Sequence, residues 1–404
     1  MSYTPHHRLR VAVAMLWIGI AGAALATPDG PPPAPSQPVT DTYHGVAVAD
    51  PYRNLEDVKN PQTLAWLRAQ AEYTSAQLAR IDGRDAMAQR IEALAAAAGD
   101  VVREVTRMPG GRIYYLKRTV GQSQPRLMLR VGLNGRERVL VDPQQLAKAS
   151  GVPHAINYFV PSWDGRTLAY GISAGGSEDA SLYLMDIATG KALRAPIPRV
   201  PSDLMHWTPD SRRLSFNQNR ELPAGAADTE TFLDTTVFLL DRDRPSKAPT
   251  PLFGPLVNRD LGLERLDVAR VMFAPGGRYM VARTTDTTVP EGRLFVAPLS
   301  DLGKAGIGWR QIAGFSDKIT DAQLRGDTLY LRTYAGAPRG RVLALDLADP
   351  VLARAREVVP EPAAGVLQSF ALGRDAIYTE RQQGFNLRVW RHTPSGPAAG
   401  ADVA

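Results

Sequence analysis

The chain has 404 residues, a formal net charge of +6 and no cysteine, and 44% of its residues are hydrophobic. The lack of cysteine excludes a disulfide framework, thiolate metal sites and thiol catalysis. The basic residues are scattered and are not interleaved with aromatic residues, so the charge indicates a solvated surface and no nucleic-acid partner.

The N-terminus has the three parts of a secretory signal peptide. Arg8 and Arg10 lie in a positive region, residues 11–25 are apolar or small, and Ala24-Leu25-Ala26 forms a small-x-small cleavage site. The apolar run is shorter than the roughly 20 residues that a membrane helix needs. We therefore favour cleavage of residues 1–26 near Ala26 over an uncleaved anchor. The mature chain, with 45 basic and 41 acidic residues and a net charge of +4, would be periplasmic or secreted, without a stable membrane span.

Two helices are predicted before any strand pattern begins. Residues 27–40 are rich in proline, which suits an extended tether. Within residues 41–98, Asn60 and Pro61 form a helix start, and apolar residues then recur at three- and four-residue steps to Ile81. A second helix is predicted over about 84–98. The later segments are sheets with no helical period, so the helices of residues 41–98 need a partner surface that those sheets do not obviously offer.

From residue 99 to residue 393 a strand-rich unit repeats six times. Each unit has an apolar or aromatic residue, a tight turn and a strand with Tyr or Phe, as in PSWDGRTLAYGI and FAPGGRYMVART. The turn markers Gly111, Gly165, Ser211, Gly277, Gly326 and Arg374 are separated by 54, 46, 66, 49 and 48 residues. A period near 50 with about four strands per unit predicts an all-β fold, a β-propeller with six visible blades. The long step holds a surface insertion, and residues 394–404 are predicted to be a disordered tail.

The turn markers have structural explanations. Three aromatic residues just before the turns are predicted to pack between blades: Trp163, Trp207 and Phe273. Three aspartates are predicted to shape their own turns through side-chain hydrogen bonds to the backbone: Asp164, Asp210 and Asp327.

Ser173 is the one candidate nucleophile that the motifs offer. Gly171-Ile172-Ser173-Ala174-Gly175 matches the nucleophile-elbow pattern, which requires a strand, a sharp turn and a helix. Here a second strand, SLYLMDI, follows the turn, so we interpret the segment as a hairpin within the second blade, whose four strands would span residues 157–200. Only His206 and His392 follow Ser173 and could act as a base in the chain order Ser, Asp, His. Catalysis by Ser173 is the disfavoured alternative.

Other chemical motifs are absent. The sequence has no H-E-x-x-H, G-x-G-x-x-G or G-x-x-x-x-G-K-[ST] pattern. Asp241-Arg242-Asp243 lacks the remainder of a calcium loop and is interpreted as a solvated turn. The adjacent acids Glu56 and Asp57 are assigned a structural or capping role. No residue is therefore predicted to be catalytic, to bind a cofactor or to bind a metal.

One segment before the first helix resembles the N-terminal signature of the prolyl oligopeptidase family. Tyr43-His44-Gly45 is followed by DPYRNLED at residues 50–57, and then by Thr63, Trp66 and Gln70 at the family's positions. The order of the first blade motifs, LVDPQQL and HWTPD, is also similar to that of the family. Asn54 is a departure, because the family usually has tryptophan there.

The resemblance implies a serine peptidase of two parts. In the family a seven-bladed propeller covers an α/β-hydrolase domain and restricts access to short peptides, which are cut mostly after proline. The Ser-Asp-His triad lies in a segment after the propeller, with its serine in a G-G-S-N-G-G elbow. We find no counterpart of the seventh blade or of that segment before Ala404. The resemblance implies that residues 41–98 would pack on the hydrolase domain. The expectation is a truncated or split enzyme, inactive alone, whose partners are short peptides and a separate hydrolase fragment.

A second class of function fits the same pattern. A stand-alone periplasmic propeller could hold a peptide or protein at its central channel as a binding scaffold. It would require a closed ring, whereas the half-enzyme predicts two uncovered surfaces: the apolar face of helix 61–81 and an unpaired strand edge on the sixth blade. The sequence offers no ligand set for a propeller enzyme with a metal or quinone cofactor, so this third class of function ranks last.

Overall fold

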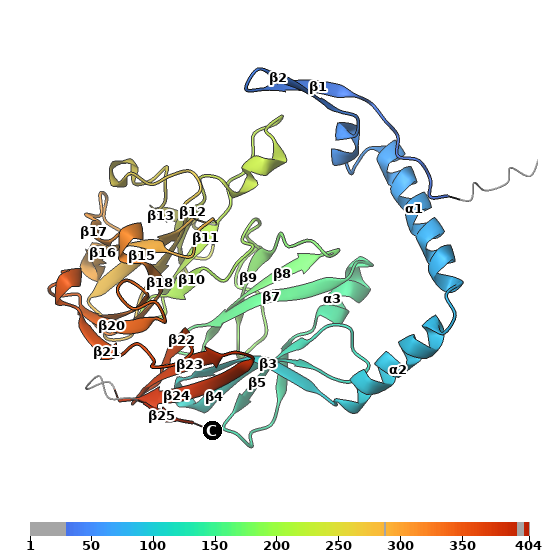
Figure 1. Cartoon of the computed structure of the whole chain (residues 1–404). Coiled ribbons are helices and arrows are strands. Elements are labelled where there is room, and N and C mark those ends of the chain that lie inside the picture. Colours follow the sequence, from blue (N-terminus) through green and yellow to red (C-terminus); the bar gives the residue numbers. More distant parts are fainter. Residues whose placement is uncertain (1–29, 287, 394–399, 404) are drawn as a thin grey trace, which may run out of the picture. The chain divides into compact units, whose positions relative to one another are not determined.

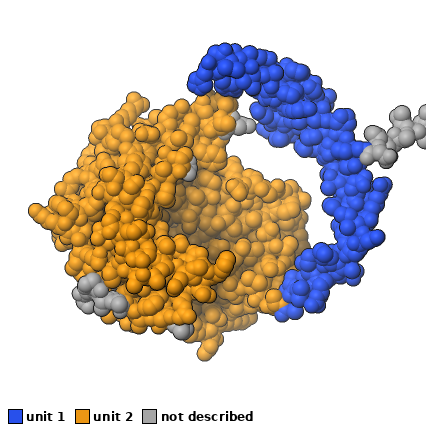
Figure 2. All heavy atoms as spheres, viewed as in Figure 1, with its two compact units in different colours: residues 1–97 blue, residues 98–404 orange. Residues whose placement is uncertain are grey.

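The computed structural model describes residues 30–286, 288–393 and 400–403. The predicted signal peptide, residues 1–26, lies outside the described residues. The chain divides into two compact units, residues 1–97 and residues 98–404 (Figure 2). Among the described residues no helix is both long enough and apolar enough to cross a membrane.

The first unit contains a β-hairpin and two helices. The hairpin joins β1 (Val39–Tyr43) to β2 (Val46–Asp50), and its turn places Gly45 at a φ of 83°. The helices α1 (Pro61–Ala79) and α2 (Arg84–Ala97) confirm the predicted pair. The side chain of Asn60 accepts a hydrogen bond from the Gln62 N–H, so α1 begins with the predicted cap. The hairpin escaped prediction because the segment was interpreted only as a signature.

The proline-rich segment is attached to the first unit instead of forming a free tether. The Pro32 carbonyl accepts hydrogen bonds from Trp66 Nε1 at 3.2 Å and from Gln70 Nε2 at 2.6 Å, both on α1. The amide of Asn54 donates to the Pro35 carbonyl at 2.9 Å. The residues of the signature thus hold the incoming chain in place, and Asn54 does so with a hydrogen bond.

The second unit is a β-propeller of six sheets, as predicted (Figure 1). Blades 1 to 3 are antiparallel meanders built from the following strands: β3 (Val101–Met108), β4 (Arg112–Arg118), β5 (Arg126–Val131) and β6 (Arg138–Val141); β7 (His154–Pro161), β8 (Thr167–Ala174) and β9 (Ser181–Asp186); β10 (Met205–Trp207), β11 (Arg213–Gln218), β12 (Thr236–Asp241) and β13 (Thr250–Phe253). The short helix α3 (Pro143–Ser150) connects blade 1 to blade 2.

Blades 4 to 6 follow the same order, with the first strand of each sheet toward the centre of the ring and the last at its rim (Figure 1). Their strands are as follows: β14 (Val268–Met272), β15 (Tyr279–Thr285), β16 (Gly292–Pro298) and β17 (Arg310–Ala313); β18 (Ile319–Arg325), β19 (Thr328–Thr333), β20 (Arg341–Asp346) and β21 (Arg356–Val359); β22 (Val366–Leu372), β23 (Ile377–Gln383), β24 (Asn386–His392) and β25 (Ala401–Asp402).

Two strand predictions were wrong. Blade 2 has three strands, and the expected fourth one is reduced to isolated bridges between Leu182 and Ile197 and between Met185 and Ala192. Prolines on either side of Ile197 cannot donate to a ladder, which explains the interruption. In the expected disordered tail, Ala401–Asp402 pairs with β24, and Arg388 forms an ion pair of 2.7 Å with the carboxylate of Asp402. The propeller therefore continues beyond residue 393.

Neighbouring blades share apolar cores. Separate clusters of buried side chains join blade 1 to blade 2, blade 2 to 3, blade 3 to 4, blade 4 to 5 and blade 5 to 6. The aromatic predictions are confirmed, since Trp207 and Phe273 are buried in these clusters and Trp163 packs against one of them. Among the described residues no apolar cluster joins blade 6 to blade 1.

Side-chain hydrogen bonds from one blade to the first strand of the next form a seam at three successive boundaries. From β11, Ser215 donates to the Val271 carbonyl at 2.8 Å and Asn217 donates to the Ala269 carbonyl at 2.9 Å. The next two boundaries use arginines in the second strand. Arg283 donates to the Thr320 carbonyl at 2.8 Å, and Arg332 donates to the Leu367 carbonyl at 2.9 Å. The bonds from Ser215 and Asn217 are buried and those from the two arginines are partly buried, and together they fix how successive sheets align.

The turn aspartates divide between local and inter-blade roles. Asp164 and Asp210 accept hydrogen bonds from the N–H groups of Arg166 and Arg212 in their own turns, as predicted. The prediction for Asp327 was wrong, because its carboxylate accepts the N–H and guanidinium of Arg278 in blade 4, both at 2.6 Å. Asp327 thus bonds a neighbouring turn, which spacing along the sequence cannot indicate.

The last blade has an uncovered face. Ile377 of β23 packs in the core shared with blade 5, so Glu380 and its cross-strand partner Val389 project from the opposite face. Leu387, which pairs with Gln382, lies on that face too. Leu387 is 57% exposed and Val389 is 37% exposed. The sheets of blades 2 to 5 contribute to cores on both faces, whereas blade 6 contributes to one.

We predict that the seam is a main source of stability. Asn217→Ala removes buried hydrogen bonds to the Ala269 carbonyl and the Thr235 hydroxyl, and should lower the free energy of unfolding by about 1 to 3 kcal/mol. Gln218 lies on the same strand as Asn217. Gln218→Ala removes an exposed hydrogen bond to the Pro198 carbonyl and should lower the free energy of unfolding by less than about 1 kcal/mol. Equal losses in urea denaturation of the two variants would contradict the role of the seam.

Candidate functional site

Ser173 lies within a sheet and not on a nucleophile elbow. It is on β8, where it pairs with Ala155 of β7 and is 5% exposed. Gly175 and Gly176, with φ values of 66° and 80°, turn the chain toward β9, and no helix follows. The hairpin interpretation is therefore confirmed. Among the described residues, the Ser173 hydroxyl forms no hydrogen bond with a histidine or a carboxylate.

The two histidines considered as bases belong to different blades. His206 is on β10 of blade 3, and His392 is on β24 of blade 6. The Nε2 atom of His392 lies 3.0 Å from the hydroxyl of Thr379 within its own sheet. The structure does not assemble either histidine with Ser173 into a triad.

The acidic motifs have structural partners. Asp57 accepts a hydrogen bond from the Lys59 N–H at the start of α1. Asp243 forms ion pairs with Arg212 and Arg242, and Arg242 also reaches Asp164 of blade 2 at 2.8 Å. The turn predicted to be merely solvated thus joins two blades. Within the described ranges no cluster of three His, Asp or Glu side chains is placed to hold a metal ion.

The inner wall of the propeller contains a hollow of about 280 Å³. The first strands of three successive blades supply its polar lining: His206 from β10, Arg270 from β14, and Asp321 and Gln323 from β18. Trp163 and Phe273 from the turns provide apolar walls. The centre of this unit is visibly hollowed in Figure 2. A concave surface that combines apolar walls with a few polar groups is typical of a ligand-binding site.

Cross-strand pairing brings further arginines behind this hollow. Arg270 pairs with Arg283 across β14 and β15, and Asp321 pairs with Arg332 across β18 and β19. Asp321 lies 3.6 Å from Arg270, and within the described part of the chain it is the only carboxylate in an ion pair with any of the three arginines. Arg283 and Arg332 donate instead to uncharged main-chain carbonyls of the seam.

The electrostatics of this cluster are positive. Burial and the charge of Arg270 lower the pKa of His206 to about 3. Burial also lowers the pKa of Arg283 to about 10, and the charges of Arg270 and Arg332 act in the same direction, against Asp321. Burial lowers the pKa of Arg332 too. His206 is therefore a neutral imidazole at physiological pH, with one N–H donor.

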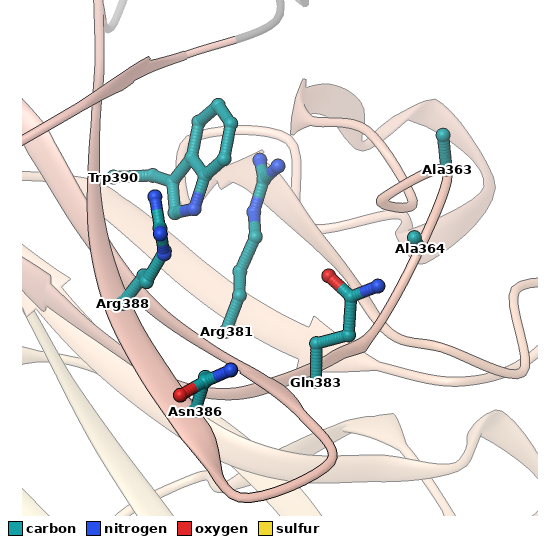
Figure 3. Close-up of a pocket in the computed structure, with 7 residues that line it drawn as sticks. All are labelled: Ala363, Ala364, Arg381, Gln383, Asn386, Arg388 and Trp390. Atoms are coloured by element: carbon teal, nitrogen blue, oxygen red, sulfur yellow. The ribbon is translucent and has the colours of Figure 1, made fainter.

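A second hollow of about 540 Å³ lies between blade 6 and its connection from blade 5 (Figure 3). The guanidinium of Arg381 lies over the ring of Trp390, 4.2 Å from its centroid. Ala363 and Ala364 form the opposite side, and Gln383, Asn386 and Arg388 complete the lining (Figure 3). Arg388 is already paired with Asp402. This hollow offers donors and a flat aromatic surface, but no nucleophile with a general base.

Neither hollow was predicted from the sequence. The available signal was an arginine inside two apolar second strands, YMVARTT and TLYLRT. Which first strand each arginine would meet depends on the arrangement of the blades. The arrangement can bind an anionic or hydrogen-bonding ligand at the inner wall, but it presents no assembled acyl-transfer machinery.

Comparisons with known proteins point to one family. Residues 31–399 match the family model for the prolyl oligopeptidase N-terminal beta-propeller domain. A prolyl endopeptidase of Elizabethkingia meningoseptica is 24% identical over 356 residues, which is 88% of this chain and 48% of that protein. Prolyl oligopeptidase A of Galerina marginata is 24% identical, over 90% of this chain and 52% of its own. The chain thus spans about half the length of these relatives.

Solved structures give the same result for the fold. A structure from a study of two prolyl endopeptidases superimposes with a TM-score of 0.77 at 25% identity, covering 91% of this chain and 52% of that one. Prolyl oligopeptidase B of Galerina marginata, bound to a 25mer macrocyclization substrate, has a TM-score of 0.75 at 18% identity and covers 92% and 54%. The second likeness concerns the fold alone.

We predict that His206 does not titrate near neutral pH. Its lowered pKa implies that its ring signals in NMR stay constant from pH 5 to pH 8. Arg270→Gln removes one of the two causes, so the midpoint should rise while remaining below 6.5, because burial persists. A His206 midpoint near 6.5 in the unaltered protein would contradict the buried, positive environment described here.

Proposed function

Because the chain belongs to the prolyl oligopeptidase family, through its N-terminal β-propeller domain, we propose that it gates the access of short proline-containing peptides to a serine peptidase domain. The observation that carries this proposal is the family match over residues 31–399. The chain contributes a ring with a hollow inner wall. Peptide cleavage would belong to a companion α/β-hydrolase domain, supplied by the same polypeptide or by a separate fragment.

The uncovered face of blade 6 supports a companion. A propeller sheet reaches full burial only when another sheet packs on each face. Leu387 and Val389 are apolar and exposed on the free face of blade 6. On blade 1, Val139 is also exposed, and it pairs with Met128 on the face opposite to the core shared with blade 2. We propose that a seventh sheet covers these end blades in the complete enzyme.

The helices of the first unit support the same proposal. Met87, Ile91 and Leu94 recur at three- and four-residue steps on α2, and all three side chains are more than half exposed. Apolar residues at this spacing form one face of a helix, which gains stability when another surface covers it. We propose that the hydrolase domain provides that surface.

We predict that this chain alone does not hydrolyse a chromogenic prolyl peptide. The chain and its Ser173→Ala variant should give the same background rate, because Ser173 lies in a sheet without a base. Mixing the chain with a hydrolase segment from a prolyl endopeptidase relative should yield a complex that cleaves the short substrate and excludes folded proteins. Size-exclusion chromatography measures complex formation, and activity assays with the short substrate and with a folded protein measure cleavage and exclusion.

Two outcomes would reject the gating proposal. Hydrolysis by the chain alone that is lost in Ser173→Ala would place the active site inside the propeller. A stable monomer that binds prolyl peptides but never associates with a hydrolase segment would favour a stand-alone scaffold.

We also propose that the protein is exported. The support is the basic region, the apolar run and the Ala24-Leu25-Ala26 site of the N-terminus. N-terminal sequencing of protein from the periplasm or medium should then start near Thr27. Retention of the intact leader in the cytoplasm would contradict export.

A further inference from the structure

The inner wall of blades 3 to 5 carries more positive charge than its neighbours neutralise. Arg270, Arg283 and Arg332 are brought together by the seam, with Asp321 as their one paired carboxylate among the described residues. The Nε atoms of all three arginines are buried, and the described residues provide no hydrogen-bond partner for them. Three guanidinium groups and one carboxylate leave a net charge of about +2 beside the 280 Å³ hollow.

Arg270 is the arginine with the greatest free capacity. Its guanidinium reaches Asp321 at 3.6 Å and the Ala322 carbonyl at 3.5 Å, and both contacts are longer than a good charge-assisted hydrogen bond. It lines the hollow together with His206, whose imidazole adds a neutral N–H donor. Arg283 and Arg332 keep their seam bonds and contribute charge from behind.

We propose that this hollow binds the side-chain carboxylate of an acidic peptide that enters the propeller. The planar fork of an arginine matches a carboxylate with two parallel hydrogen bonds. His206 provides a further polar group on the rim, and Trp163 and Phe273 provide an apolar wall for the adjoining residue. The amide of Gln323 is already bonded to main-chain groups of blade 6. This inference rests on the proposed peptide-gating function and adds a preference for acidic peptides to it.

A carboxylate of the protein already competes with the ligand for Arg270, so its removal should have the opposite effect to the removal of Arg270. Asp321 faces Arg270 and would repel an incoming carboxylate while occupying part of the guanidinium. Removing its charge should therefore strengthen acidic-peptide binding, whereas removing Arg270 should weaken it. A cluster that served only the fold would show neither response in ligand binding.

The experiment is calorimetric titration of the whole chain with three peptides of sequence Ala-Pro-Gly-X. The first has X = Glu with both ends blocked, the second has X = Gln with both ends blocked, and the third has X = Gln with a free C-terminal carboxylate. The first peptide should bind at least about tenfold more tightly than the second, as a charge-assisted pair provides. The third peptide separates recognition of a C-terminal carboxylate from that of a side chain.

Variants assign the preference to the site. Arg270→Gln should reduce the Glu-to-Gln ratio to about one, Arg270→Lys should retain part of it, and Asp321→Asn should increase it several-fold. The matched control is Arg310→Gln, an exposed arginine on β17 of the same blade, which should leave the ratio unchanged. His206 signals in NMR should shift with the Glu peptide and not with its blocked Gln counterpart.

Three results would overturn the inference. These are equal affinities for the blocked Glu and Gln peptides, no binding of any peptide, or an equal effect of Arg270→Gln and Arg310→Gln in folded protein. Equal Glu and Gln affinities would leave the gating proposal intact, because that proposal is decided by association with a hydrolase segment and by cleavage.

Discussion

The propeller depends on hydrogen bonds that cross from each sheet to the next. An apolar core shared by two blades holds the sheets together, but it does not by itself fix their alignment. Directed bonds from Asn217, Arg283 and Arg332 to main-chain carbonyls supply that alignment at three successive boundaries. Each blade therefore relies on its successor. Blade 6 has no such successor among the described sheets, and its free face carries exposed Leu387 and Val389.

The same seam brings charge to the inner wall. An arginine spans the gap between two sheets and donates several hydrogen bonds, so Arg283 and Arg332 serve as structural donors. The carbonyl groups accept hydrogen bonds from the guanidinium N–H groups, but they are uncharged and do not neutralise the positive charges. Arg270, placed opposite Arg283 by the strand register, faces the hollow under this field. Fold stability and ligand preference thus share one set of side chains.

Local patterns predicted the fold, and spatial neighbours decided the site. The turn spacing near 50 residues indicated the six blades, because every blade repeats the same short-range chemistry. Asp164 and Asp210 bond their own turns, so sequence neighbours sufficed for them. Asp327 bonds Arg278 in another blade, and no spacing rule identifies that partner. The cluster around Arg270 was missed for the same reason, since it combines strands from three blades.

Hydrogen exchange of backbone amides tests the central claim, that one face of the last sheet of this propeller is not covered by another sheet. The comparison is between β23 and β24 of blade 6 and β15 and β16 of blade 4, measured in the chain alone. Blade 4 is covered on both faces, so its amides should require a larger opening free energy, by more than about 1 kcal/mol. Equal protection of the two blades would show that blade 6 is already complete and would contradict the account.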